Sequence, residues 1–336
     1  MEYNWPTLLP LVFMAVMGLS LLAYVVLDGY DLGVGLLLPF ARDDEKDVMV
    51  SSIGPFWDAN ETWLVLGVGV LLVAFPRAHS LVLTHLYLPV AVMLIGLILR
   101  GVSFDFRVKA HAARKALWNR LFALGSLMAA MAQGWMLGSY LTGFDMGPWS
   151  LAFAALIALT LPTAYAMLGA GWLIMKTGDE LQAKAVRWSR KVFWPMGLAL
   201  LAISLSTPAV SPTVFNRWFT LPALIGLLPI PVACAAALYA TWHVANKREI
   251  VQAGYGWIVF ASTVLIFVMA FLGLAYSLFP YIVIDRMTVW QAASAHKSLV
   301  VIFIGVAITL PAIVVYTIFM YRVFWGRATA LSYGAE

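Results

Sequence analysis

Two pairs of carboxylates interrupt long apolar stretches of this sequence at helical spacing. Asp58 and Glu61 are three residues apart, and so are Asp28 and Asp31. Residues three apart on an α-helix lie on the same face. Ionisable side chains at membrane depth are costly, and they mark ion sites or proton relays when they occur there. These four carboxylates are therefore the candidate functional groups of the chain.

The position of Asp58 and Glu61 follows from the length of the apolar stretch behind them. Only 15 uncharged residues run from Thr62 to Pro76, whereas a membrane-spanning helix needs about 20. We therefore expect the helix to begin after Pro55 and to carry both carboxylates into or near the membrane. The alternative is that they are first-turn acids at the interface, where the helix dipole favours negative charge.

The segment around Asp28 and Asp31 is rich in glycine and continues into the apolar run 36–40. The two acids therefore do not mark a clean exit to water, and the glycines predict close approach of another membrane helix. A nucleotide-binding loop is excluded, because that motif requires a preceding strand. Arg100, Asp105 and Arg107 fall at the same end of the predicted bundle, which suggests a buried polar network with Arg100 as the main counter-ion.

The elements that position these residues must be membrane helices. The 336 residues are 63% hydrophobic and 11% charged, against roughly 25% charged in soluble domains. Long solid apolar blocks exclude a membrane β-barrel, whose strands alternate over about 10 residues. The sequence predicts an all-α polytopic protein with nine spans, at about 7–27, 56–76, 81–99, 121–141, 150–175, 192–212, 219–242, 256–279 and 298–321.

Charge distribution predicts the orientation of these spans. Of the 21 Lys and Arg residues, 17 fall in or beside the loops on one side and at the C-terminus. Positive residues favour the cytoplasmic side, so we expect an outside N-terminus and a cytoplasmic C-terminus. Residues 1–336 are expected to form one membrane domain, with spans 1–4 and 5–8 as two four-helix units and span 9 extra. Met1 to Pro6 holds no Lys or Arg, which argues against a cleaved signal peptide.

No redox centre is expected on this chain. A single cysteine, Cys234, excludes intrachain disulfides and cysteine-ligated clusters. The five histidines fall in predicted loops or near span ends, and the methionines are expected to fill the core rather than to ligate haem. The net charge of +5 resides in the loops, so it does not indicate nucleic-acid binding.

Four segments give the chain a family resemblance. They are LDGYDLGVG at 27–35, WDANETWL at 57–64, RGVSFDFR at 100–107 and YRVFWGR at 321–327. In order and spacing they resemble the motifs of subunit II of cytochrome bd-type quinol oxidases. That family more often has Gly at position 59, and Gln is common at 61. The compact loops are similar to the forms often called cyanide-insensitive.

The resemblance implies a heterodimeric terminal oxidase of the bacterial cytoplasmic (inner) membrane that oxidises quinol and reduces dioxygen to water. It implies that haems b and d, or b alone, belong to subunit I and that this chain ligates no cofactor. The implied partners are subunit I, membrane lipids and quinol, and the family is compatible with a small single-span accessory subunit. A quinone is expected only as substrate or as a structural lipid.

Oxygen reduction consumes protons, and a chain of cytoplasmic-side carboxylates suits their uptake. Asp58 is the leading candidate relay, supported by Asp28 and Asp31, with Glu61 as a further participant. Two alternatives remain, namely a purely structural subunit and an independent proton or cation carrier. The expected electrostatic partners and the residues that line the path or pack beside it are Arg100, Asp105, Arg107, Trp57, Asn60 and Trp63.

Overall fold

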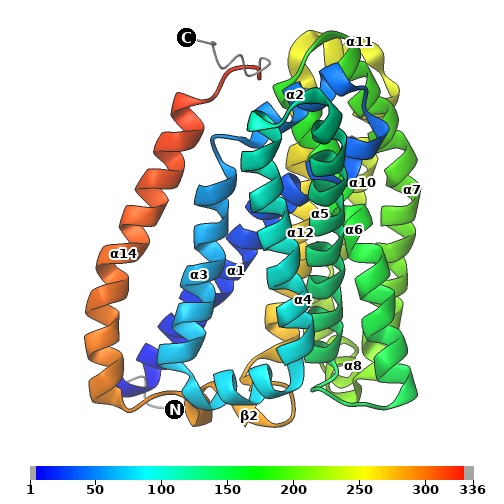
Figure 1. Cartoon of the computed structure of the whole chain (residues 1–336). Helices are drawn as coiled ribbons and strands as arrows, with labels where there is room; N and C mark the ends of the chain where they lie inside the picture. The colour runs from blue at the N-terminus through cyan, green and yellow to red at the C-terminus, as the bar shows by residue number, and fades with distance from the viewer. Residues whose placement is uncertain (1–4, 329–336) are drawn as a thin grey trace.

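The computed structural model describes residues 5–328, except for the side chains of residues 112 and 113. Residues 329–336 lie outside this range, and so do Met1–Asn4, which belong to the segment used above to argue against a signal peptide. In this range nine segments are long and apolar enough to cross a membrane (Figure 1). The long helices that form them are α1 (Trp5–Leu37), α3 (Trp57–Ala74), α4 (Pro76–Lys109), α5 (Ala112–Leu141), α6 (Pro148–Lys176), α7 (Asp179–Val210), α10 (Pro229–Asn246), α12 (Trp257–Leu278) and α14 (His296–Val323).

Short elements connect the spans. A 3-10 turn (Leu38–Phe40) and helix α2 (Asp43–Ile53) separate α1 from α3. The only strands in the described part of the chain form an antiparallel hairpin of β1 (Tyr281–Val283) and β2 (Met287–Thr288). The remaining short elements are α8 (Pro212–Trp218), α9 (Ala223–Leu227), α11 (Arg248–Ile250), a π-helical turn (Val251–Tyr255) and α13 (Val289–Ala292).

The nine predicted spans are confirmed, but several of the helices are longer than the predicted spans. Helix α1 continues through Asp28 and Asp31 to Leu37, and α4 continues through Arg100 to Lys109. Helix α7 begins already at Asp179, outside the predicted span. The charged residues continue the helices because helical backbone satisfies its own hydrogen bonds wherever it lies. The seventh span is not one continuous helix, because it is divided between α9 and α10.

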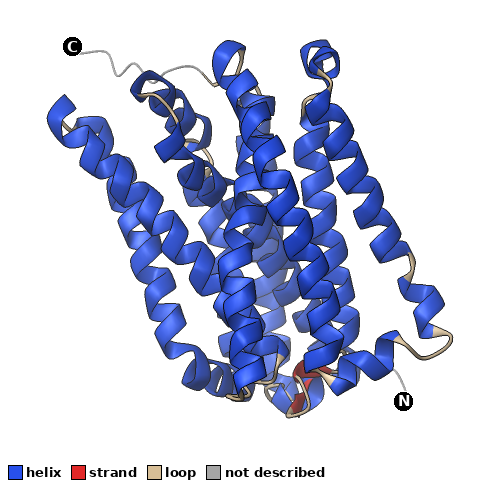
Figure 2. Ribbon diagram, turned by 90° about the vertical axis from the view of Figure 1, so that its right-hand side faces the viewer, coloured by secondary structure: helices blue, strands red, loops and turns tan. Residues whose placement is uncertain are grey.

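The two ends of the bundle differ in composition. Helices α2 and α11 and the C-terminal end of α14 lie at one end, here named the α2 end, while α8 and the β-hairpin lie at the opposite end, the hairpin end (Figures 1 and 2). All 17 basic residues of the predicted cytoplasmic side belong to the α2 end or to the half of a helix that leads to it. The sequence-based sidedness therefore corresponds to a physical end of the molecule.

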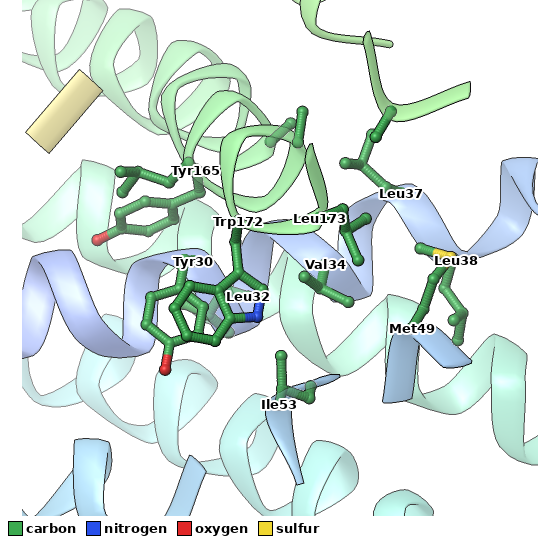
Figure 3. Packing of buried hydrophobic residues seen from close by; sticks show 14 of the residues in the cluster. Tyr30, Leu32, Val34, Leu37, Leu38, Met49, Ile53, Tyr165, Trp172 and Leu173 are labelled. Atoms are coloured by element: carbon green, nitrogen blue, oxygen red, sulfur yellow. The ribbon is translucent and has the colours of Figure 1, made fainter. Parts of the chain in front are cut away.

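Helices α1 and α6 approach closely enough for their backbones to touch. A Cβ atom on Gly33 would lie 1.8 Å from the carbonyl oxygen of Tyr165, and one on Gly169 would lie 2.3 Å from the carbonyl carbon of Gly33. Beside this contact, the rings of Tyr30 and Trp172 stack with centroids 4.1 Å apart (Figure 3). The glycines thus hold α1 closely against α6, as expected of small residues in membrane helices, while Asp28 and Asp31 lie on the other side of α1, toward α4 and α3.

The long helices pack in one continuous bundle. Helices α1, α3, α4 and α5 contact one another, and so do α6, α7, α10 and α12. Helix α6 packs against α1 and α5 as extensively as against α7 and α12, so the expected two four-helix units are not separated from each other. Helix α14 lies at the edge of the bundle, where it packs against α3 and α1 (Figure 1). Very little of its apolar surface is buried within the described part of the chain.

Candidate functional site

Arg100 is the centre of a buried ionic cluster. Its Nη1 atom lies 2.6 Å from Oδ1 of Asp28 on α1, and its Nη2 atom donates to Oε1 of Glu61 on α3. The residues Arg100 and Asp28 are 2% and 1% exposed, whereas the Glu61 side chain is 28% exposed. Three helices thus converge on one guanidinium. Its planar fork suits two carboxylates at once.

Asp31 joins this cluster through an amide. The Nδ2 atom of Asn60 donates to Oδ2 of Asp31 over 2.8 Å, and both residues are fully buried. Asp31 also interacts electrostatically with Asp28, Arg100 and Glu61. Its Oδ1 atom is buried without a hydrogen-bond partner among the described residues. Asn60, expected only to line or pack beside the path, therefore touches a candidate carboxylate directly.

A second amide supports the Asp28 side of the cluster. Gln133 on α5 accepts from the hydroxyl of Tyr165 at 2.5 Å and donates to the hydroxyl of Tyr24 at 2.9 Å. Tyr24 interacts in turn with Asp28, one helical turn away. Sequence reasoning missed these residues, although a signal existed. Gln133 is an uncharged polar residue in the middle of the predicted span 121–141.

The charge balance of the cluster decides what it can do. Arg100 pairs with Asp28 and Glu61, and Asp31 is a third carboxyl group within electrostatic range. One ionised carboxylate is enough to neutralise the guanidinium. In a low-dielectric interior an uncompensated charge is expensive. The other carboxyl groups can therefore be protonated, and one proton can enter the cluster as another leaves without a change in its net charge. The sequence suggested Arg100 as the main counter-ion, and in the structure it pairs with Asp28 and Glu61 but not directly with Asp31.

Asp58 lies apart from these buried groups. It is exposed in the first turn of α3 and interacts electrostatically with Glu61, one turn further along. Of the neighbouring tryptophans, Trp57 packs on Phe104 with ring centroids 5.3 Å apart, whereas Trp63 is 8% exposed. The Nε1 atom of Trp63 is buried without a hydrogen-bond partner among the described residues.

Arg107 does not join the Arg100 cluster, contrary to the single network expected from the sequence. It donates to Asp47 on α2 at 2.6 Å and to Asn119 on α5 at 2.5 Å. Lys115 also pairs with Asp47, at 2.9 Å. Asp105 is exposed on the opposite face of α4 and makes no ion pair among the described residues. The sequence could not reveal this separation, because it depends on where α2 folds back.

The environment of Asp47 favours its charged form. Burial raises the pKa of this carboxyl, but hydrogen bonds from Lys115 and Arg107 outweigh burial and hold the pKa below its usual value of 3.8. The same balance acts on Glu45, whose pKa is lowered by Lys184 and by the backbone N–H of Arg42 against the opposing effect of burial. These acids tie α2 to neighbouring helices as fixed charges.

The histidines lie at the ends of the bundle. His79 and His296 begin helices rather than occupying loops, and His243 lies in the last turn of α10. His85 stacks on Phe144 near the hairpin end. Among the described residues no group of three His, Cys, Asp or Glu side chains is placed to hold a metal ion. That this chain ligates no haem stays a prediction.

Comparisons with known proteins agree on one family. The family model of cytochrome bd terminal oxidase subunit II matches residues 9–324. Cytochrome bd ubiquinol oxidase subunit 2 of Bacillus subtilis is 27% identical over 328 residues, covering 91% of this chain and 93% of the relative. Cytochrome bd-I ubiquinol oxidase subunit 2 of Escherichia coli K12 is 24% identical over 368 residues, with 93% of each chain covered.

A solved structure shows the same fold. The chain resembles a chain of the bd oxidase from Geobacillus thermodenitrificans with a TM-score of 0.75 and 17% identity, covering 94% of this chain and 98% of that one. Together with the nine apolar helices, the match over nearly the whole length assigns a multi-pass bacterial membrane protein. The chain therefore belongs to the family of cytochrome bd terminal oxidase subunit II and is a subunit of a quinol:oxygen oxidoreductase complex.

Proposed function

We propose that this chain is the non-haem subunit of its oxidase and supplies part of the path by which cytoplasmic protons reach the site of oxygen reduction in subunit I. The observation that carries the proposal is the buried cluster in which Arg100 pairs with Asp28 and Glu61, while a third carboxyl group, Asp31, interacts with all three electrostatically. Such a cluster can take up one proton as it releases another, so its net charge is kept and no uncompensated charge is buried. A purely structural ion pair would need only one carboxylate.

The proposed order of groups runs from the surface inward. Asp58 is exposed, Glu61 is partly exposed, and Asp28 and Asp31 are buried beside Arg100. Arg100 Nε and Ser103 Oγ are buried without hydrogen-bond partners among the described residues. These atoms could bind internal water, which carries protons between carboxyl groups that do not touch. Glu61 and Asp58 would therefore connect the buried pair to the outside of the chain.

The direction of uptake depends on the orientation of the chain in the membrane. Arg100 lies nine residues before the end of α4 at the α2 end, or about 14 Å along the helix. The basic residues at the α2 end favour a cytoplasmic location for it. A reporter enzyme active only in the cytoplasm should therefore work when fused after Glu336. Activity there of a reporter that works only in the periplasm would overturn the orientation and the uptake direction together.

Haems b and d, or b alone, are proposed to reside in subunit I, with quinol oxidised there. The placement of all five histidines near the bundle ends supports this division. His85→Ala and His243→Ala should leave the haem absorption bands of the purified complex unchanged. Stoichiometric haem on this chain expressed without subunit I would contradict the proposal.

The decisive experiment replaces single carboxylates by amides of the same shape. Asp58→Asn and Asp28→Asn should each yield an assembled complex with normal haem bands but slow quinol-driven oxygen consumption. A general acid–base step contributes about 10²–10⁴-fold, so a loss of that order is expected where no other carboxyl group substitutes. Asp44→Asn, which removes an exposed acid on α2 outside the cluster, is the matched control and should leave turnover unchanged.

The scaffold alternative predicts the opposite pattern. If the acids only hold helices together, the variants should lose assembled complex while the surviving complex turns over normally per haem. An assembled Asp58→Asn complex with unchanged oxygen consumption would remove Asp58 from the path. The same result for Asp28→Asn would leave the chain as a scaffold.

A further inference from the structure

Helix α14 reaches the carboxylate cluster through one side chain. Most of the helix is exposed on the outside of the bundle, yet Tyr321 in its last turns contacts residues of α1 and α3. The hydroxyl oxygens of Tyr321 and Tyr30 are 2.6 Å apart, and the Tyr321 ring stacks on Phe56 with centroids 4.7 Å apart. A helix with little other burial thus contributes a polar group beside Asp31.

The hydrogen bonds among these groups form a closed ring with one consistent direction. Asn60 Nδ2 donates to the Tyr30 hydroxyl over 2.9 Å, and the Tyr321 hydroxyl donates to Asn60 Oδ1 over 3.2 Å. Each hydroxyl has a single proton, so Tyr321 has none left for Tyr30. Tyr30 must therefore donate to Tyr321. Every donor in the ring is then used once, and the orientation of the Asn60 amide is fixed.

The ring determines how Asp31 is held. One hydrogen of Asn60 Nδ2 is committed to Tyr30, and the other has two acceptors within reach, Asp31 Oδ2 at 2.8 Å and the Leu27 carbonyl at 3.2 Å. The carboxylate oxygen is the nearer of the two. This is the single hydrogen bond that Asp31 accepts among the described residues. We propose that Tyr321 is a positioning residue for Asp31, because its hydroxyl closes the ring that orients Asn60 and hence the only donor to that carboxylate. The consequence for turnover rests on the proposed role of Asp31 in proton uptake.

The end of α14 is fastened in a way that suits this role. The buried ammonium of Lys176, at the end of α6, donates to the carbonyls of Phe324, Trp325 and Gly326 at 2.5, 3.1 and 3.2 Å. The backbone N–H of Ala328 donates to the Lys176 carbonyl at 2.8 Å. Tyr321 lies immediately before the segment that Lys176 binds, so these hydrogen bonds fix the position of its hydroxyl relative to Asn60.

The test removes only the hydroxyl. Tyr321→Phe keeps the aromatic side chain that stacks on Phe56 but breaks the closed ring of hydrogen bonds. Tyr30→Phe also breaks this ring of hydrogen bonds. We expect normal assembly, a shifted pH profile of quinol-driven oxygen consumption, and turnover lowered roughly 2- to 10-fold, the worth of about one hydrogen bond. Because both hydroxyls belong to one ring, the double variant should be no slower than either single variant. Tyr316→Phe, an exposed tyrosine of the same helix, is the control and should change nothing.

A spectroscopic readout separates this inference from the proposed function. The infrared carboxyl or carboxylate band that disappears in Asp31→Asn should be displaced in Tyr321→Phe and unmoved in Tyr316→Phe. An unmoved Asp31 band in both Tyr321→Phe and Tyr30→Phe would overturn the positioning role. A displaced band together with unchanged turnover in Asp31→Asn would support positioning while removing Asp31 from the proton path. Additive losses in the double variant would also overturn the single-ring inference.

Discussion

Arg100 and Arg107 lie two helical turns apart on α4, and both are nearly fully buried, yet their surroundings differ in charge balance. Arg100 pairs with Asp28 of α1 and Glu61 of α3 and interacts electrostatically with a third carboxyl group, Asp31. Arg107 faces one carboxylate, Asp47, which it shares with Lys115. The first cluster has more acids than bases, so some of its carboxyl groups can carry protons. The second has more bases than acids, so its one carboxylate stays ionised and serves only as a fixed ion-pair partner. The ratio of acidic to basic groups, rather than residue type or burial, distinguishes a candidate proton relay from a structural ion pair.

The depth of the two clusters reinforces the difference. The acids around Arg100 belong to helices α1 and α3 inside the membrane-spanning segments, while Asp47 belongs to α2, outside them. Glu45 on α2 likewise pairs with Lys184 of α7 at 2.7 Å. The ion pairs of α2 therefore lie where water can relieve part of an imbalance. An imbalance at Arg100 has to be met by protons or by neighbouring dipoles.

Replacing Arg100 should have the largest effect on the molecule. Arg100→Gln leaves several buried carboxyl groups without a cation, and breaking a buried pair in this way costs about 3–5 kcal/mol. We expect little intact complex to be recovered through a tag on this chain, measured by co-purification of subunit I. Combining Arg100→Gln with Asp28→Asn should recover part of the assembly, because one unpaired charge is removed. Equal losses in the single and double variants would show that charge balance is not what Arg100 supplies.

Replacing Arg107 should have a smaller effect of a different kind. Arg107→Gln leaves Asp47 paired with Lys115 and partly exposed, so the expected cost is about 1–3 kcal/mol, the range for hydrogen bonds to charged groups. The assembled complex should melt earlier but consume oxygen at the normal rate per haem. A selective loss of turnover at unchanged thermal stability would contradict the division between the two clusters.

The pH dependence of stability should show the smallest difference. The lowered pKa of Asp47 means that its ionised form stabilises the fold, so this contribution is complete above about pH 4. It is lost as the pH falls below that value and the carboxylate is protonated. Melting temperatures of the wild type should therefore drop more steeply below about pH 4 than those of Asp47→Asn. Parallel curves for the two proteins would show that Asp47 contributes no pH-dependent stability.

Local patterns predicted much of the candidate site. Helical spacing placed Asp58 and Glu61 in the first turns of a helix, and the glycines near Asp28 predicted the contact that Gly33 makes with α6. These inferences succeed because spacing and side-chain size act within one helix or at one face of it. The polar partners Gln133 and Tyr321 could not be assigned, because each comes from a helix far along the chain whose rotation is set by packing.

The sequence by itself determined that the chain is a nine-span helical membrane protein and predicted which side is basic, because hydrophobic length and loop charge act without regard to tertiary contacts. Tertiary structure decided which acid meets which base. Asp47 reaches Arg107 only because α2 folds back over the bundle, and Asp58 is exposed while Glu61, one turn away, meets Arg100. Charges pair through space, and a one-dimensional pattern fixes spacing along a helix but not the rotation of its neighbours.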